Sequence, residues 1–476
     1  MCGIAAYATG RGVEVNRAVS EVISLLIELQ HRGQEAVGLS VLNLDGSFSH
    51  IYTRGLATEV NNISPMGSDS GKAFGCLGHV RYSTTGGYWD SSTQPITVGE
   101  GGLRLSLVFN GTIANYRNLL PLAKGFDLGL LKKGMESDTY ALALALYSIT
   151  KELGGDVIEG LKELSRYIVG AYSLALLTSE PRLVLAKDPR GFRPLAYTYL
   201  GDTLYAASET AALDMLGLDS WKEVEPGAII SFDGGSLEIS SSPVTAEPSP
   251  CIFEYVYFSR ADSYFNGVSI YTARYRMGEA LAKVAPAEAD VVVSVPDSAR
   301  VAALGYSAAS GIPLAEGLVA NKYVGRVFIS PPKVRGQLSK LKYGIVKEAV
   351  FRRRVILVDD SIVRGTTMRS LISKLRNSGA LAVHVRVSSP PFRCPCFMGI
   401  DIASREELIA WRATDIGAIC KEIGADTLAY NTLKELISAI GLPSACHACF
   451  SCRYPFPGLD VERLERMFGG RCRQCL

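Results

Sequence analysis

The chain has 476 residues, which is more than one hydrophobic core usually organises, so we expect two or three domains. Apolar residues make up 47% of the chain, and 49 basic side chains nearly balance 47 acidic ones. This balance argues against a general binder of nucleic acid or membrane surfaces. Without a basic leader or a run of roughly 18 apolar residues, we expect a cytoplasmic protein with no nucleic-acid or membrane partner.

A cysteine directly follows the initiator methionine in the opening stretch MCGIAAYATG. If Met1 is removed, Cys2 carries a free α-amino group, which titrates near neutral pH and can act as a base for its own thiol. A buried, inert cysteine on a first strand would look the same, because free cysteines are commonly buried. Position alone leaves both interpretations open.

The rest of the first half alternates short strands with helices. The stretch RAVSEVISLLIELQHRG has apolar residues at helical spacing, which predicts one face packed on a core. Four turns rich in Gly or Asn/Asp follow, at HRGQEAVGLS (31–40), GHVRYSTTGG (78–87), VFNGTIANYRNL (108–119) and MESDTYALA (135–143). Together with Cys2, these four turns resemble the class II glutamine amidotransferases, whose glutaminase nucleophile is the N-terminal residue.

This resemblance implies an αββα Ntn-hydrolase sandwich over residues 2–245. In it, Cys2 is the nucleophile on the glutamine side-chain amide, and Asn110 and Gly111 form the oxyanion hole. The glutamine itself would be bound by Arg81 at its α-carboxylate, by Asp138 at its α-ammonium group and by Arg32 beside the thiol. The family often has His before the oxyanion Asn, where this chain has Phe109.

A polar stretch, SSSPVTAEPSP (240–250), then predicts a linker. Beyond it, continuous β-branched runs alternate with helical patterns, which is typical of a parallel sheet covered on both faces. We therefore expect a doubly wound α/β domain over residues 246–440. A Cys-rich tail, 441–476, would pack on this domain.

One strand of this second domain ends in two carboxylates and a loop of small residues, in VILVDDSIVRGTTMRSL. Open α/β sheets bind ligands at the carboxyl ends of their strands, and a helix N-terminus attracts phosphate. An acidic strand end before an ordinary capped helix would also explain the pattern. The stretch resembles the signature of the type I phosphoribosyltransferases, which implies phosphoribosyl pyrophosphate (PRPP) and Mg²⁺ as ligands.

The resemblance assigns roles residue by residue. The ribose hydroxyls would meet Asp359 and Asp360, and the 5′-phosphate side of PRPP would be bound by Ser361, Arg364, Gly365, Thr366 and Thr367. In the earlier loop SVPDSAR, the pyrophosphate would meet Asp297 and Ser298. Magnesium would be held by Ser298, Asp359 and Asp360. A basic segment beginning NKYVGR would form a lid through Lys322, Tyr323 and Arg326, although a solvated basic loop has the same composition.

Both halves together resemble the family of PRPP amidotransferases along nearly the whole chain. The implied reaction converts glutamine, water and PRPP into 5-phosphoribosylamine, glutamate and pyrophosphate, the first committed step of purine synthesis, with ammonia channelled between the sites. The family also implies a homotetramer. A catalytically inactive or regulatory paralogue with the same two domains is the alternative. In the family, a lysine helps to bind inhibitory nucleotides, and this chain has Ala320 in its place. Feedback inhibition by purine nucleotides is therefore in doubt for this chain.

Eleven cysteines in a reducing compartment predict metal binding or catalysis rather than disulfides. One branch of the family holds a [4Fe–4S] cluster, and this resemblance assigns the ligands to Cys251, Cys396, Cys446 and Cys449. A structural zinc site would use the same ligand type, and cysteines that hold no metal are a further alternative. Further candidates are Cys394, Cys452, Cys472 and Cys475.

Overall fold

The computed structural model describes residues 2–62, 71–82, 93–125, 137–321, 342–402 and 404–472. It divides into two compact units, each with its own core. The first unit comprises residues 1–250 together with 397–401, and the second comprises 251–396 and 402–476. No helix in the described part of the chain is both long and apolar enough to span a bilayer.

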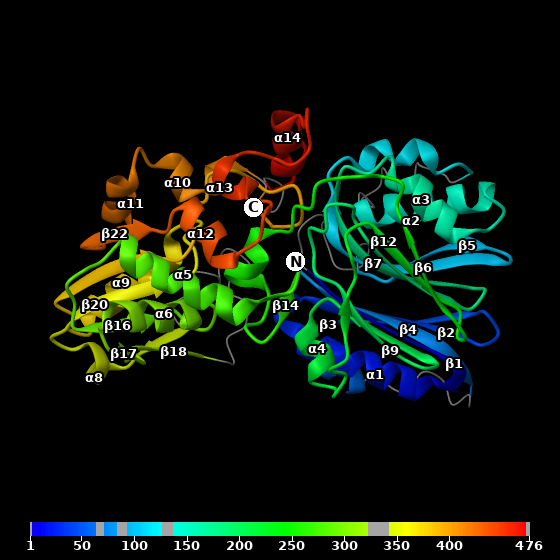
Figure 1. The fold of residues 1–476 in the computed structure, drawn as a ribbon, viewed down its shortest axis with the longest axis horizontal. Helices are drawn as coiled ribbons and strands as arrows, with labels where there is room; N and C mark the ends of the chain where they lie inside the picture. Colours follow the sequence, from blue (N-terminus) through cyan, green and yellow to red (C-terminus); the bar gives the residue numbers. More distant parts are fainter. Residues whose placement is uncertain are drawn as a thin grey trace. The chain divides into compact units, whose positions relative to one another are not determined.

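The first unit contains two antiparallel sheets (Figure 1). Among the described residues, one sheet has the order β11 (Lys222–Glu223), β9 (Ala196–Leu200), β10 (Thr203–Ala207), β1 (Gly3–Glu14), β4 (Lys72–Arg81), β2 (Ala36–Asn43) and β3 (Phe48–Arg54). The other has the order β13 (Leu237–Ser241), β12 (Ala228–Phe232), β8 (Arg182–Lys187), β7 (Gly170–Thr178), β6 (Leu103–Ile113) and β5 (Ile96–Glu100).

Helices cover the outer faces of these sheets. On the first sheet lies α1 (Val15–Glu28), whose Val22, Leu25 and Leu26 are buried as its sequence pattern predicts. On the second lie α2 (Asp138–Glu152) and α3 (Val157–Ser165). Shorter helices are η1 (Gln30–Arg32), η2 (Ala57–Asn62), η3 (Tyr116–Asn118), η4 (Leu120–Leu122) and α4 (Thr210–Asp214).

The period-2 alternation of strand side chains builds two layers of core in this unit. Along β1, Ala5 and Tyr7 face α1, whereas Ile4 and Ala6 pack between the two sheets. The layer order is therefore helix, sheet, sheet, helix. The predicted αββα sandwich is confirmed.

A short segment from later in the chain completes the first unit. Arg193 is fully buried, and its Nε donates a hydrogen bond to the backbone oxygen of Met398 at 3.1 Å. Gly399 lies beside it at φ 113°, and a Cβ there would meet the guanidinium at 2.8 Å. A buried cation needs such a partner, so the segment 397–401 is part of this fold.

The second unit is built on a parallel sheet. Its order is β17 (Leu314–Ala315), β16 (Val291–Ser294), β20 (Arg354–Asp359), β21 (Ala382–Val387) and β22 (Thr427–Tyr430). The helices are α5 (Ile270–Val284), α6 (Arg300–Ser310), α8 (Lys347–Val350), α9 (Thr366–Asn377), α10 (Ile409–Arg412), α11 (Ile416–Ile423), α12 (Leu433–Ile440), α13 (Ala448–Ser451) and α14 (Val461–Cys472). Smaller elements are η6 (Glu254–Phe258), η8 (Arg405–Glu407) and the pairs β14 (Tyr264–Phe265) with β15 (Val268–Ser269) and β18 (Leu318–Ala320) with β19 (Tyr343–Ile345).

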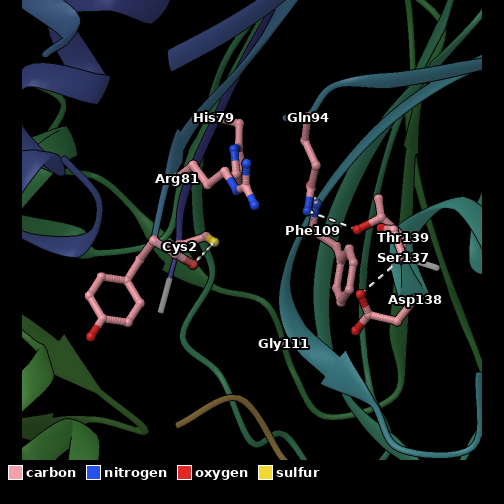
Figure 2. A pocket seen from close by; sticks show the side chains of 10 residues that line it. Cys2, His79, Arg81, Gln94, Phe109, Gly111, Ser137, Asp138 and Thr139 are labelled. Carbon is pink, nitrogen blue, oxygen red and sulfur yellow. Dashed lines mark hydrogen bonds between the residues drawn. The ribbon is translucent and has the colours of Figure 1, made fainter. Parts of the chain in front are cut away.

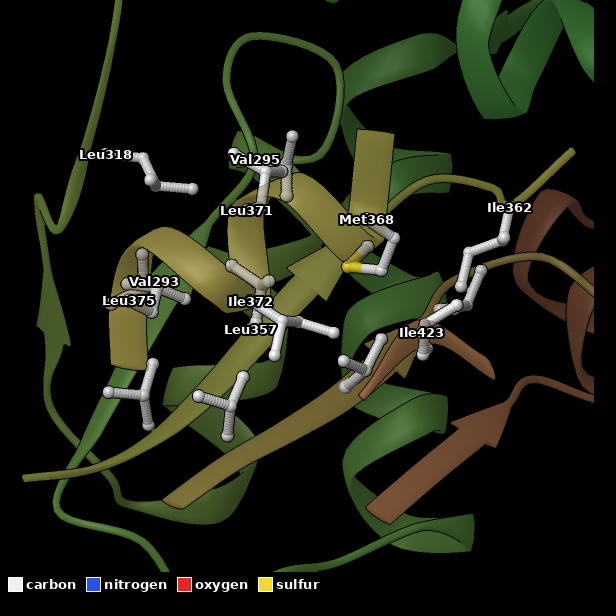
Figure 3. Close-up of a cluster of buried hydrophobic side chains, with 14 of the residues drawn as sticks. Val293, Val295, Leu318, Leu357, Ile362, Met368, Leu371, Ile372, Leu375 and Ile423 are labelled. Carbon is white, nitrogen blue, oxygen red and sulfur yellow. The ribbon is translucent and has the colours of Figure 1, made fainter. Parts of the chain in front are cut away.

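Both faces of this sheet are buried, which is why its strands are continuously apolar. Val293 and Leu357 pack with Leu371 of α9 on one face (Figure 3). On the other face, Val292 and Ile356 pack with residues of α5 and α6. The predicted doubly wound arrangement is confirmed for this unit.

The structure corrects the expectation that the cysteines avoid disulfides. Cys394 and Cys452 form one, with their Cα atoms 5.4 Å apart. The pairing follows from backbone contacts that sequence spacing does not reveal: the amides of Arg393 and Cys394 both donate to the carbonyl of Cys449, at 2.9 and 3.1 Å. These bonds bring α13 and the cysteine after it against the segment that carries Cys394.

Loss of this disulfide is expected to lower the melting temperature by roughly 8–16 °C. The bond spans 58 residues of sequence, and cross-linking a loop of that size stabilises a protein by about 4 kcal/mol. Scanning calorimetry would compare the oxidised protein with the double variant Cys394→Ala and Cys452→Ala. Cys420→Ala is the control, because that thiol is free. Equal melting temperatures for the double variant and the oxidised protein would contradict the prediction.

Candidate active sites

Cys2 lies at the start of β1, in a pocket of the first unit. β1 pairs with β4 so that Gly3 is opposite Val80, which brings Cys2 to the end of β4. Its thiol donates a long hydrogen bond to the carbonyl oxygen of Tyr82 at 3.6 Å (Figure 2). The pocket is lined by Cys2, His79, Arg81, Tyr82, Gln94, Phe109, Gly111, Ser137, Asp138 and Thr139. Four of the residues predicted from the sequence, Cys2, Arg81, Gly111 and Asp138, therefore meet here.

Asn110 and Gly111 lie on β6, where β7 approaches closely. A Cβ on Gly111 would meet the carbonyl oxygen of Ala171 at 1.9 Å, so only glycine fits at this position. Asn110 is fully buried, and neither its amide nitrogen nor its amide oxygen has a hydrogen-bond partner among the described residues. Buried polar groups are normally paired, so a free buried amide beside a pocket indicates a group that awaits a ligand.

Asp138 is the first residue of α2 and is 6% exposed. Its Oδ2 accepts a hydrogen bond from the amide of Ile113 at 3.1 Å, and its Oδ1 accepts one from the amide of Thr139 at 3.0 Å. These bonds hold a carboxylate at the pocket wall and tie α2 to β6.

Arg32 is not among the residues that line the pocket. It is 1% exposed in η1, and its Nε lies 2.8 Å from Oε1 of Glu209, an oxygen that also lies 2.7 Å from Nε2 of His31. Its neighbour Gly33 packs against the backbone of Arg81, where a Cβ would approach the carbonyl carbon to 2.5 Å. A direct role of Arg32 in glutamine binding stays a prediction.

Six residues of the pocket were not among the predicted site residues: His79, Tyr82, Gln94, Phe109, Ser137 and Thr139. Two of them, His79 and Gln94, are buried polar side chains. His79 is fully buried, with no hydrogen-bond partner for either ring nitrogen among the described residues. Burial and then the charge of Arg81 lower the pKa of His79 to about 3, so the ring is neutral at neutral pH. The only sequence signal was a polar residue within an apolar strand for His79, and a Gln before a Pro at a strand start for Gln94.

The second candidate site lies at the carboxyl end of β20. Asp359 and Asp360 are 8% and 6% exposed. The hydroxyl of Ser298 donates to Oδ2 of Asp360, and the hydroxyl of Ser361 donates to Oδ1 at 2.6 Å. Burial raises the pKa of Asp360, and burial followed by the charge of Asp360 raises the pKa of Asp359 well above its usual value. A nearby cation would stabilise the ionised forms of these two buried carboxylates.

The start of α9 supplies the neighbouring part of this site. Gly365 precedes the helix at φ 80°, and Thr366 and Thr367 begin it. The first N–H groups of a helix have no partner within the helix, so this end suits a phosphate. The Nε of Arg364 donates to Oε2 of Glu407 at 2.9 Å, so its guanidinium is engaged by a carboxylate.

The remaining residues predicted for this site are placed differently. The side chain of Asp297 is 80% exposed, and its carboxylate lies 3.4 Å from the guanidinium of Arg300. The predicted lid residues Lys322, Tyr323 and Arg326 lie outside the described residues. On either side of that segment, β18 and β19 pair antiparallel.

Four cysteines converge in the second unit. Cys251 and Cys446 form an isolated parallel bridge, and the amide of Ile252 donates to the carbonyl of Cys446 at 3.1 Å. The pKa of the Cys449 thiol is raised by burial and by the nearness of Cys251, Cys396 and Cys446. Yet no group of three or more His, Cys, Asp or Glu side chains in the described part of the chain is arranged to hold a metal ion.

Comparisons with known proteins agree with these two units. A family model described as a glutamine amidotransferase domain matches residues 79–215. An amidophosphoribosyltransferase from Pyrococcus horikoshii is 44% identical over 438 residues, 92% of this chain and 94% of that protein. One from Bacillus subtilis is 38% identical over 439 residues, 90% of each chain.

Solved structures extend the agreement to the whole fold. The B. subtilis glutamine PRPP amidotransferase, complexed with ADP and GMP, matches with a TM-score of 0.83 at 37% identity and covers 97% of this chain and 99% of that one. The structure of an allosteric regulatory enzyme of purine biosynthesis matches with a TM-score of 0.83 at 36% identity, covering 98% and 99%.

Fold and pockets together define a glutamine amidotransferase joined to a phosphoribosyltransferase-like domain. At these identities over nearly the full length, the assignment extends to the activity. The chain belongs to the amidophosphoribosyltransferase family and is an enzyme of purine biosynthesis.

Proposed function

We propose that Cys2, once Met1 has been removed, releases ammonia from glutamine and that this ammonia reacts with PRPP. The free α-amino group takes the thiol proton, and the sulfur attacks the carbonyl carbon of the side-chain amide. The α-ammonium group of Cys2 returns this proton to the amide nitrogen, ammonia leaves, and water then hydrolyses the thioester to give glutamate. The ammonia attacks C1 of the ribose, pyrophosphate leaves, and 5-phosphoribosylamine forms.

The observation that carries the first half-reaction is the amide of Asn110 beside Gly111, which has no hydrogen-bond partner among the described residues. Negative charge develops on the carbonyl oxygen as sulfur attacks, and preorganised donors at that point stabilise the transition state. A buried Nδ2 that no described residue pairs costs stability in the free protein and is satisfied when the oxyanion forms. This argument supports Asn110 and Gly111 as the oxyanion hole.

The same pocket carries the charges needed to bind the amino-acid end of glutamine. Arg81 is 4% exposed and can form a forked pair with the α-carboxylate, and the Asp138 carboxylate can accept the α-ammonium group. Arg32 remains a proposed glutamine-binding residue, and the turn that it anchors through Glu209 packs against the backbone of Arg81.

In the second unit, we propose that Asp359 and Asp360 face the ribose hydroxyls and that Ser361 and the segment 364–367 bind the 5′-phosphate. The start of α9 supports this assignment. Asp297 and Ser298 would meet the pyrophosphate. Arg364 would have to exchange its bond to Glu407 for a phosphate oxygen to take part.

Magnesium fits the group formed by Ser298, Asp359 and Asp360, because carboxylate and hydroxyl oxygens are the ligands that it prefers. The raised pKa values of the two carboxylates support a cation there, since a nearby positive charge relieves the cost of their buried negative charge. When bound, the ion would neutralise the charge of the departing pyrophosphate. The protein's own groups orient the ribose and exclude water from C1.

A [4Fe–4S] cluster fits Cys251, Cys396, Cys446 and Cys449, since four neighbouring thiols are its usual ligands. A single zinc ion would need all four sulfurs about 2.3 Å from one point. Zinc on the same four thiols, or no metal at all, are the alternatives, and metal analysis distinguishes them. The cluster would join the segment around Cys446 and Cys449 to the rest of the unit and would stabilise the fold without a redox step.

Protein purified without oxygen is expected to contain about four irons per chain and to absorb broadly near roughly 400 nm. Cys449→Ser should abolish both signals, because a buried thiolate ligand is lost. Cys420→Ser is the matched control, a free cysteine that shows no electrostatic coupling to the other four. Stoichiometric zinc with no iron would support the alternative ligand, and absence of both metals would contradict a metal site.

A direct assay separates this function from that of an inactive or regulatory paralogue. Glutamine, PRPP and Mg²⁺ should yield glutamate and pyrophosphate in equal amounts. Because free ammonia is mostly protonated at neutral pH, we propose that it passes to PRPP without mixing with solvent. Absence of pyrophosphate formation with either glutamine or ammonia would identify an inactive relative. Family membership also supports a homotetramer in the cytoplasm, which sedimentation velocity and cell fractionation would test.

A further inference from the structure

Strand β6 has an open edge along the glutamine pocket. Among the described residues, β5 pairs with β6 only between Leu103 and Leu107. On the other edge, β7 remains paired as far as Ile113. Backbone N–H groups along an antiparallel strand alternate between its two edges, so those of Phe109, Gly111 and Ile113 all face the open edge.

Side chains occupy two of these three positions. Oε1 of Gln94 accepts a hydrogen bond from the amide of Phe109 at 2.6 Å. Oδ2 of Asp138 accepts one from the amide of Ile113 at 3.1 Å. The N–H of Gly111 lies between them on the same edge. Gln94 and Asp138 therefore take the place of a neighbouring strand and leave a gap at the position where an oxyanion donor is needed.

Gln94 also reaches the start of α2. Its Nε2 donates to Oγ1 of Thr139 at 3.2 Å, and the residue is 6% exposed at the pocket wall (Figure 2). One side-chain amide thus joins the residue before Asn110 to the residue after Asp138. This link and the bond from the amide of Ile113 to Asp138 both hold the start of α2 against β6.

We propose that Gln94 is a positioning residue for glutamine hydrolysis, which holds the edge of β6 so that the N–H of Gly111 and the amide of Asn110 face the substrate carbonyl oxygen. The inference rests on the proposed function of the Cys2 pocket and goes beyond it by naming what fixes the oxyanion hole. Oxyanion donors act on the transition state more than on bound substrate, so Gln94 contributes to kcat rather than to KM.

Gln94→Met tests this role, because methionine keeps the length of the side chain and removes both hydrogen bonds. We expect the kcat of glutamine hydrolysis to fall about 100-fold, the effect of a small misplacement or the loss of one oxyanion donor. KM for glutamine should change less than about threefold, because Asp138 keeps its bond to Ile113. Ammonia-dependent synthesis from PRPP should be unchanged.

Two further variants sharpen the result. Gln94→Glu keeps an acceptor for the amide of Phe109 and should recover at least about tenfold of the lost kcat. Asn115→Leu is a matched control: Asn115 also bridges two backbone groups, the carbonyl of Tyr167 and the amide of Val169, but it does not line the pocket. Its kcat and KM should stay close to those of the parent.

Three results would contradict the proposed role of Gln94 or the function on which it rests, and they can be told apart. Wild-type kcat in Gln94→Met, or a rise in KM alone, would overturn the positioning role. Equal loss of the ammonia-dependent reaction would show that Gln94 only supports folding, which also overturns it. If Cys2→Ala kept glutamine hydrolysis, the proposed function of the pocket would fail first, whatever Gln94 does.

Discussion

Cys2→Ala is expected to lower the rate of glutamine-dependent phosphoribosylamine synthesis by a factor of about 10⁴ or more. Synthesis from ammonia should continue. The substitution removes the sulfur that bonds to the substrate and leaves the second unit untouched. Initial rates of pyrophosphate release with each nitrogen donor would measure the two effects. N-terminal mass spectrometry should show that the mature chain begins at Cys2.

Cys76→Ala is the control for this experiment. Cys76 lies on β4, next to β1, but it is fully buried in the core and away from the pocket lining. Its loss should cost stability and leave both nitrogen donors usable. A fully active protein that retains Met1 would contradict the N-terminal nucleophile, because the α-amino group would then sit on the wrong residue.

Asp360→Asn, unlike Cys2→Ala, should reduce phosphoribosylamine formation from both nitrogen donors, by about 10²–10³. The carboxylate accepts hydrogen bonds from Ser298 and Ser361, and an amide cannot offer the same negative charge to a cation or ribose. Glutamine hydrolysis at Cys2 should continue, measured as glutamate released in the presence of PRPP.

Asp290→Asn is the matched control for this prediction. Asp290 directly precedes β16 of the same sheet, but its carboxylate is paired with Arg354 near the surface. Its loss should leave both rates unchanged. An Asp360→Asn protein with normal synthesis from ammonia would remove this carboxylate from the reaction.

The fold was largely predictable because the composition of its strands indicates which of their faces are buried. Continuous β-branched runs such as Val291–Val293 must be covered on both faces, and the parallel sheet follows. The acidic pair after β20 was predictable for a similar reason, because the carboxyl end of a buried parallel strand is a known place for ligands.

The role of Gln94 and the disulfide could not be predicted from the sequence, because both depend on how distant segments of the backbone pair in the fold. Gln94 matters because β5 begins at Ile96, opposite Leu107, so that β5 does not pair with Phe109 and the side chain of Gln94 accepts a hydrogen bond from its amide instead. Nothing in the local sequence indicates where the pairing of β5 with β6 stops. The Cys394–Cys452 disulfide was missed for a related reason, since 58 residues separate the two thiols and only the folded backbone brings them together.

The segment 397–401 limits how the two activities could be exchanged between proteins. A gene fusion that joins residues 1–250 to another acceptor domain would carry every strand of the glutaminase but not the carbonyl of Met398. The guanidinium of Arg193 would then lose both that hydrogen bond and the packing of Gly399 against it. A single recombination at the linker is therefore expected to destabilise the glutaminase, which favours inheritance of the two halves of this enzyme together.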